Sequence, residues 1–194
     1  MPENPVYNAI IARRTIRKFL QKPVPKETLS KLINAARLAP SGGNRQPLDY
    51  MLIDDAALGA ELFKHVRWAG YITPKGIPKS NEMPTAYIVV LEEKSVKSTS
   101  VAYDVGAAVQ NIMLAAWEEN IGCCWQGAID RPKIREFFRI PADFEIDSVV
   151  SLGYKAEAPV VEDYKGSVKY WLDEAGVLHV PKLKLEDVVR WNKF

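Results

Sequence analysis

The chain has 194 residues, of which 47 % are hydrophobic and 26 % are charged. This length is ordinary for one domain, and the apolar fraction can fill a sizeable core, so we expect residues 1–194 to form a single domain. The 26 Lys and Arg nearly balance the 24 Asp and Glu, which leaves a formal charge of +2. That balance argues against a dedicated nucleic-acid-binding protein.

We expect neither a membrane span nor a secretory leader. No apolar run approaches the roughly 20 residues that a helix needs to cross a bilayer. Met1–Asn4 lacks the basic and apolar regions that open a signal peptide. The two cysteines, Cys123 and Cys124, are adjacent, and adjacent cysteines rarely form a disulfide. These features favour a cytoplasmic protein with reduced thiols.

The first half of the chain is predicted to contain three helices and two strands. Apolar residues with helical spacing indicate a helix over 4–12 and, after two prolines that break regular structure, another over 26–38. An apolar run indicates a strand over 48–53. A helix over 56–66 and a buried strand over 86–91 follow.

The second half opens with the strongest helical pattern of the chain, around 105–116, which we expect to end at Gly122. This helix is small and apolar on nearly all sides, so it is either buried or part of a subunit interface. A strand is predicted to begin at Cys123. A helix over 131–139 and a strand over 146–154 follow.

The C-terminal part is predicted to contain a β-hairpin. Asp173–Gly176 has turn chemistry and separates two apolar runs, over 168–172 and 177–180. The last residues, 185–194, are amphipathic and aromatic. Taken together, four or five helices around a small sheet indicate an α+β fold.

The segment Arg13–Arg17 carries three arginines and a threonine. If it is extended, Arg13, Thr15 and Arg17 share one face, and Ile16 points the other way into a core. Planar guanidinium groups beside a hydroxyl are suited to binding a phosphate. Surface ion pairs are the alternative interpretation of this segment.

Pro40–Pro47 forms a second polar segment. Its two glycines allow a backbone to approach a flat ligand closely. Ser41, Asn44 and Gln46 supply donors and acceptors that suit the edge of a heteroaromatic ring. A plain loop between a helix and a strand is the alternative.

Residues 123–127 form a third segment, at the expected end of a strand. Core packing explains the two cysteines, since a catalytic thiol needs a histidine partner and neither His65 nor His179 lies in a recognisable motif. The sequence has no metal-ligand spacing and no nucleotide-binding glycine motif. A chain with ligand-binding loops but no evident nucleophile, metal or acid–base pair suggests a cofactor that supplies the chemistry.

These segments together resemble the nitroreductase family of FMN-dependent oxidoreductases. The resemblance covers nearly the whole chain and is carried by residues 13–19, 35–47, 104–111 and 151–154. It implies a homodimer of α+β subunits, each with a mainly antiparallel central sheet flanked by helices. It also implies an extensive helical interface and two FMN sites within that interface.

The resemblance implies a role for each matched residue near the N-terminus. Arg13, Arg14 and Thr15 would hold the FMN phosphate and the ribityl chain, and Arg17 would lie near the pyrimidine edge of the flavin. A basic residue near the C-terminus usually completes the phosphate site, and Lys182 is the candidate for that role.

Two other segments are implied to contact the flavin ring. Pro40, Ser41 and Asn44 would reach it from the partner subunit, with Gln46 close by. A segment at the end of the strand would pack over the ring, with a backbone N–H near Gly127 facing flavin N5. The residues of that segment are Cys124, Trp125, Gln126 and Gly127.

The implied activity is hydride transfer from NAD(P)H to a nitroaromatic, quinone or related acceptor by a ping-pong mechanism. The irregular stretch 67–84, with Trp68 and Tyr71, would form a lid over the substrate face. Two alternatives stay open. One is a specialised enzyme on the same fold, such as a dehalogenase, a flavin-consuming enzyme or an azoline dehydrogenase. The other is a non-catalytic flavin-binding redox sensor.

Overall fold

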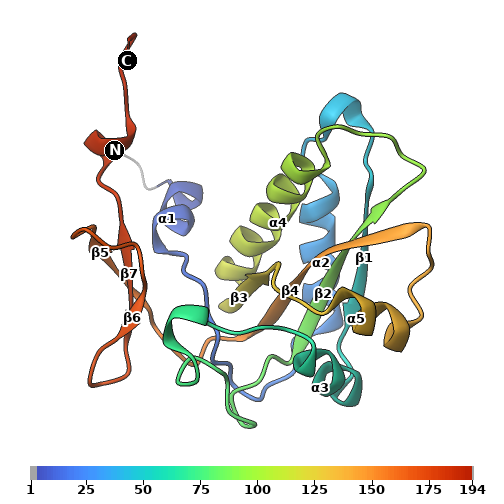
Figure 1. Cartoon of the computed structure of the whole chain (residues 1–194), viewed down its shortest axis with the longest axis horizontal. Helices are drawn as coiled ribbons and strands as arrows, with labels where there is room; N and C mark the ends of the chain where they lie inside the picture. The colour runs from blue at the N-terminus through green and yellow to red at the C-terminus, as the bar shows by residue number, and fades with distance from the viewer. Residues whose placement is uncertain (1–3, 194) are drawn as a thin grey trace.

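The computed structural model describes residues 4–193. Its central sheet has four strands in the order β1-β2-β4-β3, and every neighbouring pair is antiparallel (Figure 1). These strands are β1 (Leu48–Ile53), β2 (Ala86–Glu93), β3 (Ile121–Gln126) and β4 (Phe144–Tyr154). The predicted α+β fold with a mainly antiparallel sheet is confirmed.

Helices cover both faces of the central sheet. One face packs against α2 (Lys26–Arg37) and α4 (Val101–Glu118), and the other packs against α3 (Ala56–Lys64) and α5 (Arg131–Phe138). Alternate residues of β2 therefore enter different cores, which explains why this strand is apolar without a break. Its residues Ile88 and Val90 face α2 and α4, whereas Tyr87 and Val89 face α3 and α5.

The long helix α4 differs from the prediction at its C-terminal end. The helix ends at Glu118, and Gly122 lies inside β3, so the prediction that Gly122 ends the helix is wrong. The turn falls at Asn120, whose φ of 58° is in the left-handed region. Asparagine adopts that region more readily than most residues, so it can reverse the chain without a glycine.

The arginine segment lies against the edge of the central sheet. It follows α1 (Pro5–Ala12), and Thr15 forms a parallel bridge with Cys123. Two glycines of the sheet allow this close approach. A Cβ at Gly122 would lie 2.5 to 2.7 Å from side-chain atoms of Ile16, and one at Gly153 would lie 2.9 to 3.1 Å from Phe19.

A second, smaller sheet lies beyond α1 and has the order β5-β7-β6 (Figure 1). Its strands are β5 (Val160–Asp163), β6 (Trp171–Leu172) and β7 (Leu178–Lys182), with β5 parallel and β6 antiparallel to β7. The predicted hairpin is confirmed, although β6 is shorter than expected. The turn is closed by the Val177 carbonyl, which accepts from the Asp173 N–H at 3.1 Å.

The described chain ends in a short helix, α6 (Leu185–Val188), and an extended tail. In Figure 1 this tail points away from the two sheets, and Trp191 is 84 % exposed. The predicted amphipathic segment continues to Phe194, which lies outside the described residues. Within residues 4–193, no helix is both long and apolar enough to cross a bilayer.

Candidate functional site

A cavity of about 330 Å³ lies between the arginine segment and the second sheet. Strand β7 contributes its wall on one side, and the chain that follows α1 contributes the other. We call it the cationic cavity, because four of the side chains that line it are basic. Its lining residues are Ile10, Arg13, Arg14, Thr15, Arg17, Tyr170, Val180 and Lys182.

The four basic side chains of the cationic cavity have no acidic counterpart. Among the described residues, none of them forms an ion pair with a carboxylate. Arg13 Nε is buried without a hydrogen-bond partner, and the Arg13 guanidinium otherwise faces Met113 Sδ at 3.8 Å. Burial, together with the nearby Arg13 charge, lowers the pKa of Arg14. A bound anion would satisfy the buried N–H and relieve this repulsion.

Arg17 is held in place from several sides. Its guanidinium carbon lies 4.8 Å from the centre of the Tyr170 ring, and its own backbone N–H donates to Glu157 Oε1 at 2.5 Å. It also lies beside the Cys124 thiol. Burial raises the pKa of Cys124 to about 11, and Arg17 offsets only part of that shift. This thiol therefore stays protonated near neutral pH and is not a nucleophile.

The end of β3 divides its predicted site residues between two faces. Cys124 and Gln126 are buried on one face, and Trp125, on the other, is 42 % exposed and donates from Nε1 to Ser148 Oγ at 2.7 Å. Gln126 Nε2 is buried without a partner. Gly127 is exposed, with open space where a Cβ would be. A side-chain N–H donor without a partner and an open backbone position therefore lie on neighbouring residues.

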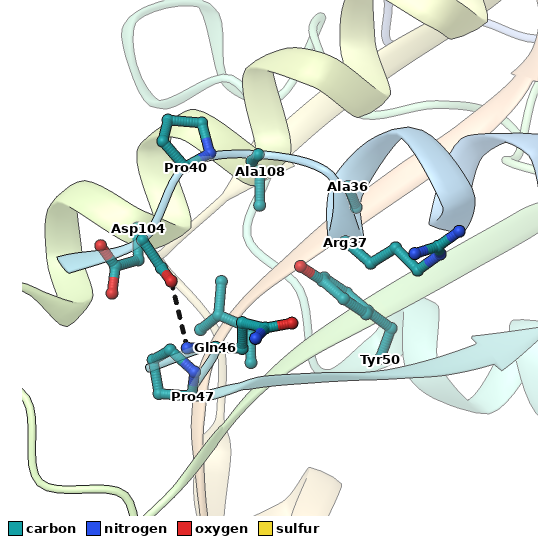
Figure 2. A pocket seen from close by; sticks show the side chains of 11 residues that line it. Ala36, Arg37, Pro40, Gln46, Pro47, Tyr50, Asp104 and Ala108 are labelled. Atoms are coloured by element: carbon teal, nitrogen blue, oxygen red, sulfur yellow. Dashed lines mark hydrogen bonds between the residues drawn. The ribbon is translucent and has the colours of Figure 1, made fainter. Parts of the chain in front are cut away.

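The predicted residues of the second polar segment line a different pocket, of about 180 Å³ (Figure 2). Pro40, Ser41 and Gln46 contribute to it, and the Gln46 N–H donates to Ser41 Oγ at 3.1 Å, which is the dashed line in Figure 2. Asn44 is exposed, with a φ of 51°. The Tyr50 hydroxyl points into this pocket, and burial raises the pKa of Tyr50 to about 12, with a smaller contribution from Asp49.

Asp104 of α4 fixes the position of this segment. Its Oδ1 accepts a hydrogen bond from the Gly42 N–H at 2.9 Å, while its Oδ2 is buried without a partner. A Cβ at Gly42 would lie 2.1 Å from Ser100 Oγ, so the loop approaches α4 closely only because this residue is a glycine.

A single chain does not bring all the predicted site residues together. One cavity is lined by Arg13, Arg14, Thr15, Arg17 and Lys182. The other is lined by Pro40, Ser41 and Gln46, and the two cavities share no lining residue. In Figure 1 the two regions lie on different sides of α4. The resemblance assigns the 40–46 segment to the partner subunit, which agrees with this separation.

The stretch 67–84 is only partly an exposed cover. Trp68 is buried in the core and packs against Phe63, with their ring centres 5.3 Å apart. Tyr71 is 57 % exposed, and its ring centre lies 4.9 Å from that of Tyr170. Sequence reasoning missed Tyr170. The only available signal was the predicted hairpin, whose first apolar run, 168–172, contains Tyr170.

Comparison with known proteins gives the family. The model of the nitroreductase family matches residues 10–154, which include the arginine segment, the 40–46 segment and the whole central sheet. The chain therefore belongs to the nitroreductase family. It also resembles a protein of Archaeoglobus fulgidus named "Putative NADH dehydrogenase/NAD(P)H nitroreductase", with 34 % identity over 75 % of this chain and 82 % of that one.

Two further relatives bear on the cofactor and the reaction. A crystal structure of a "putative nitroreductase in complex with fmn" from Desulfovibrio desulfuricans has a TM-score of 0.69 and 28 % identity, covering 84 % of this chain and 94 % of that one. The 5,6-dimethylbenzimidazole synthase of Rhodospirillum rubrum is 25 % identical over 77 % of this chain and 82 % of its own. Relatives of this chain therefore include both an FMN complex and a biosynthetic enzyme.

Proposed function

We propose that this chain is an FMN-dependent oxidoreductase that transfers hydride from NAD(P)H to nitroaromatic, quinone or related acceptors. The observation that carries the proposal is the cationic cavity, which gathers Arg13, Arg14, Arg17 and Lys182 without an acidic partner among the described residues. A phosphate monoester is the anion that such a group of donors would hold most strongly. FMN carries this group at the end of its ribityl chain.

Each residue of the cavity would have a distinct part in holding the cofactor. Arg13, Arg14 and Lys182 would bind the phosphate together with the Thr15 hydroxyl. Tyr170 covers the face of the Arg17 guanidinium, so this group would donate to the pyrimidine edge of the flavin through N–H groups in its own plane. Bound FMN would supply the two-electron chemistry. The fixed charge of Arg17 favours the negative charge that reduction leaves at that edge.

A second copy of the chain would complete the site. Pro40, Ser41 and Gln46 line a separate pocket, and Asn44 is exposed in the same segment, so these four residues would meet the flavin only from a partner subunit. The outer surfaces of α1 and α4 offer apolar side chains to such an interface, among them Val6 at 63 % and Tyr103 at 80 % exposure. Light scattering of the purified protein should give the mass of a dimer.

The two cysteines fit a reducing compartment, and we propose a cytoplasmic location. Cys123 and Cys124 are both free and buried. Burial raises the pKa of each thiol, so both groups pack as apolar side chains in the core.

Steady-state kinetics test the proposed reaction. If NAD(P)H and the acceptor use the same flavin face in turn, initial rates at several acceptor concentrations should give parallel double-reciprocal lines. Intersecting lines would contradict this mechanism. A redox sensor would instead show slow reduction by NADH and NADPH and no turnover of either acceptor class.

A specialised enzyme on the same fold is the second candidate. The family model ends at Tyr154, so the second sheet lies beyond the matched part and adds a wall to the cationic cavity. A relative named 5,6-dimethylbenzimidazole synthase shows that similar chains carry other reactions. The flavin absorbance during aerobic incubation with NADPH separates the two candidates. A flavin-consuming enzyme would lose it, whereas an NAD(P)H oxidoreductase would keep it.

A further inference from the structure

One wall of the cationic cavity is followed outward by two tyrosines in contact, with their rings tilted against each other. Tyr170 lines the cavity and lies over Arg17, at 4.8 Å from the guanidinium carbon. The ring centre of Tyr71 is 4.9 Å from that of Tyr170, with an angle of 56° between the rings. Lys169 Nζ lies 5.9 Å from the centre of the Tyr71 ring. The order from the cavity outward is therefore cation, ring, ring, cation.

The Tyr71 ring is exposed, but its backbone is fixed. Tyr71 belongs to a short 3₁₀ helix, Gly70–Ile72. The Thr73 hydroxyl is within hydrogen-bonding distance of the carbonyl oxygens of Trp68, at 3.2 Å, and Ala69, at 3.1 Å. Trp68 itself is buried in the core. The protein thus presents an aromatic ring to solvent on a backbone that is already ordered. Binding of a ligand there would cost little conformational entropy of the protein.

The chemistry of this surface indicates the class of ligand. An exposed phenol ring stacks favourably on another planar aromatic ring. The ammonium group of Lys169, 5.9 Å from the centre of that ring, adds a positive charge that suits a carboxylate or another anionic oxygen. The Tyr71 ring is more than half exposed, so a ligand can reach it.

We propose that Tyr71 and Lys169 determine acceptor specificity by binding planar aromatic acceptors that carry an anionic oxygen substituent. The aromatic ring of the acceptor stacks on Tyr71, and its anionic group lies toward the Lys169 ammonium. Tyr170 supports Tyr71 from behind and links this surface to Arg17. This inference rests on the proposed function, because it assumes that the acceptor meets a flavin held in the cationic cavity.

The test compares three acceptors with the FMN-loaded protein at saturating NAD(P)H: para-nitrobenzoate, nitrobenzene and ferricyanide. Tyr71→Ala should raise KM for the two aromatic acceptors about two- to tenfold, because an aromatic stacking contact is lost. It should leave ferricyanide turnover and FMN content unchanged. Tyr71→Phe keeps the ring and should match the parent protein.

The charge is tested separately with Lys169→Gln. This variant should raise KM for para-nitrobenzoate about two- to fivefold and leave KM for nitrobenzene unchanged. Lys165→Gln is the matched control, because Lys165 is an exposed lysine of the same chain segment. It should change neither KM value.

Equal KM values for aromatic acceptors in the parent protein and Tyr71→Ala would overturn the inference. An equal loss of ferricyanide turnover would also overturn it, because Tyr71 would then have a structural role. Calorimetric binding of para-nitrobenzoate without NAD(P)H separates this result from a failure of the proposed function. If the parent protein holds no FMN or is not reduced by NAD(P)H, the function fails. In that case, equal affinity of parent and Tyr71→Ala for para-nitrobenzoate would reject the tyrosine surface as well.

Discussion

The central sheet and the second sheet of this protein are stabilised by different interactions. Strands β2 and β4 of the central sheet are buried on both faces between helices. In the strands of the second sheet, only Leu178 is buried. Side-chain contacts of His179 add to the backbone pairing of this sheet: its Nδ1 lies 2.5 Å from Glu162 Oε1, and its Nε2 lies 3.2 Å from Asp173 Oδ2. Apolar burial therefore fixes one sheet, and a charged cluster fixes the other.

This difference extends to the cationic cavity, because the cavity has a wall on each side. The arginine segment lies along β3, the edge strand of the central sheet. Tyr170, Val180 and Lys182 belong to the second sheet or lie next to it. The Trp171 ring also stacks on His179, with the ring centres 4.2 Å apart. One wall of the cavity thus depends on core packing, and the other depends on the protonation state of His179.

The largest expected effect comes from crowding the wall on the central sheet. In Gly122→Ala, the new methyl group would meet Ile16 at 2.5 to 2.7 Å, so the arginine segment must move. Overpacking of this kind should lower the free energy of unfolding by about 1–3 kcal/mol. It should also weaken FMN retention, because Thr15 and Arg17 flank Ile16. Urea unfolding and the flavin content of the purified variant measure the two effects.

Gly70→Ala is the control for that change, because a Cβ there has no atom within 4 Å. It should leave both measurements near those of the parent protein. Equal stability and flavin content in Gly122→Ala would show that the arginine segment does not depend on this close approach.

A smaller and more local effect is expected from pH at the second sheet. Hydrogen bonds to Asp173 and Glu162 raise the pKa of His179 above its usual 6.5, although burial opposes them. The stabilisation is therefore complete below pH 6.5 and is lost as pH rises through the raised pKa. A hydrogen bond from the Val177 N–H contributes most to lowering the pKa of Asp173 below 3.8, so acid protonates Asp173 only below that value.

Amide exchange measured by NMR tests this pH dependence. As pH rises above 6.5, protection of β7 amides should fall relative to that of β2 amides, while β2 stays protected. His179→Gln cannot titrate, so its β7 protection relative to β2 should not change with pH. The same loss of protection in β2 and β7 would contradict the distinction between the two sheets.

The central sheet was largely predictable from the sequence, whereas only the β6–β7 hairpin of the second sheet was. Strand β1 has the predicted bounds, since its apolar run is clear and ends at charged residues. Strand β5 was missed because its four residues, Val160–Asp163, are mostly exposed and lack an apolar pattern. The predicted end of α4 is wrong because Gly122 is the glycine nearest to the end of the helical pattern, whereas Asn120 makes the turn.

The candidate site shows the same division. The arginines could be grouped because they are neighbours in sequence, and burial of Ile16 agrees with the expected extended backbone. In a strictly extended segment, Arg14 would point away from Arg13 and Arg17. In the structure it lines the same cavity as these two residues. The contact between Tyr71 and Tyr170 joins two irregular parts of the chain. No local pattern carries that information, because the contact depends on how the second sheet packs against residues 67–84.

The affinity of the cofactor-free protein for FMN and for riboflavin, measured by calorimetry, tests the phosphate assignment most directly. Riboflavin lacks the phosphate, and each charge-assisted hydrogen bond contributes about 1.5–3 kcal/mol, so two such bonds predict at least about 100-fold tighter binding of FMN. Arg13→Ala should weaken FMN binding about tenfold or more and leave riboflavin binding unchanged. Equal affinities for the two flavins, or full FMN retention by Arg13→Ala on dilution, would contradict the assignment.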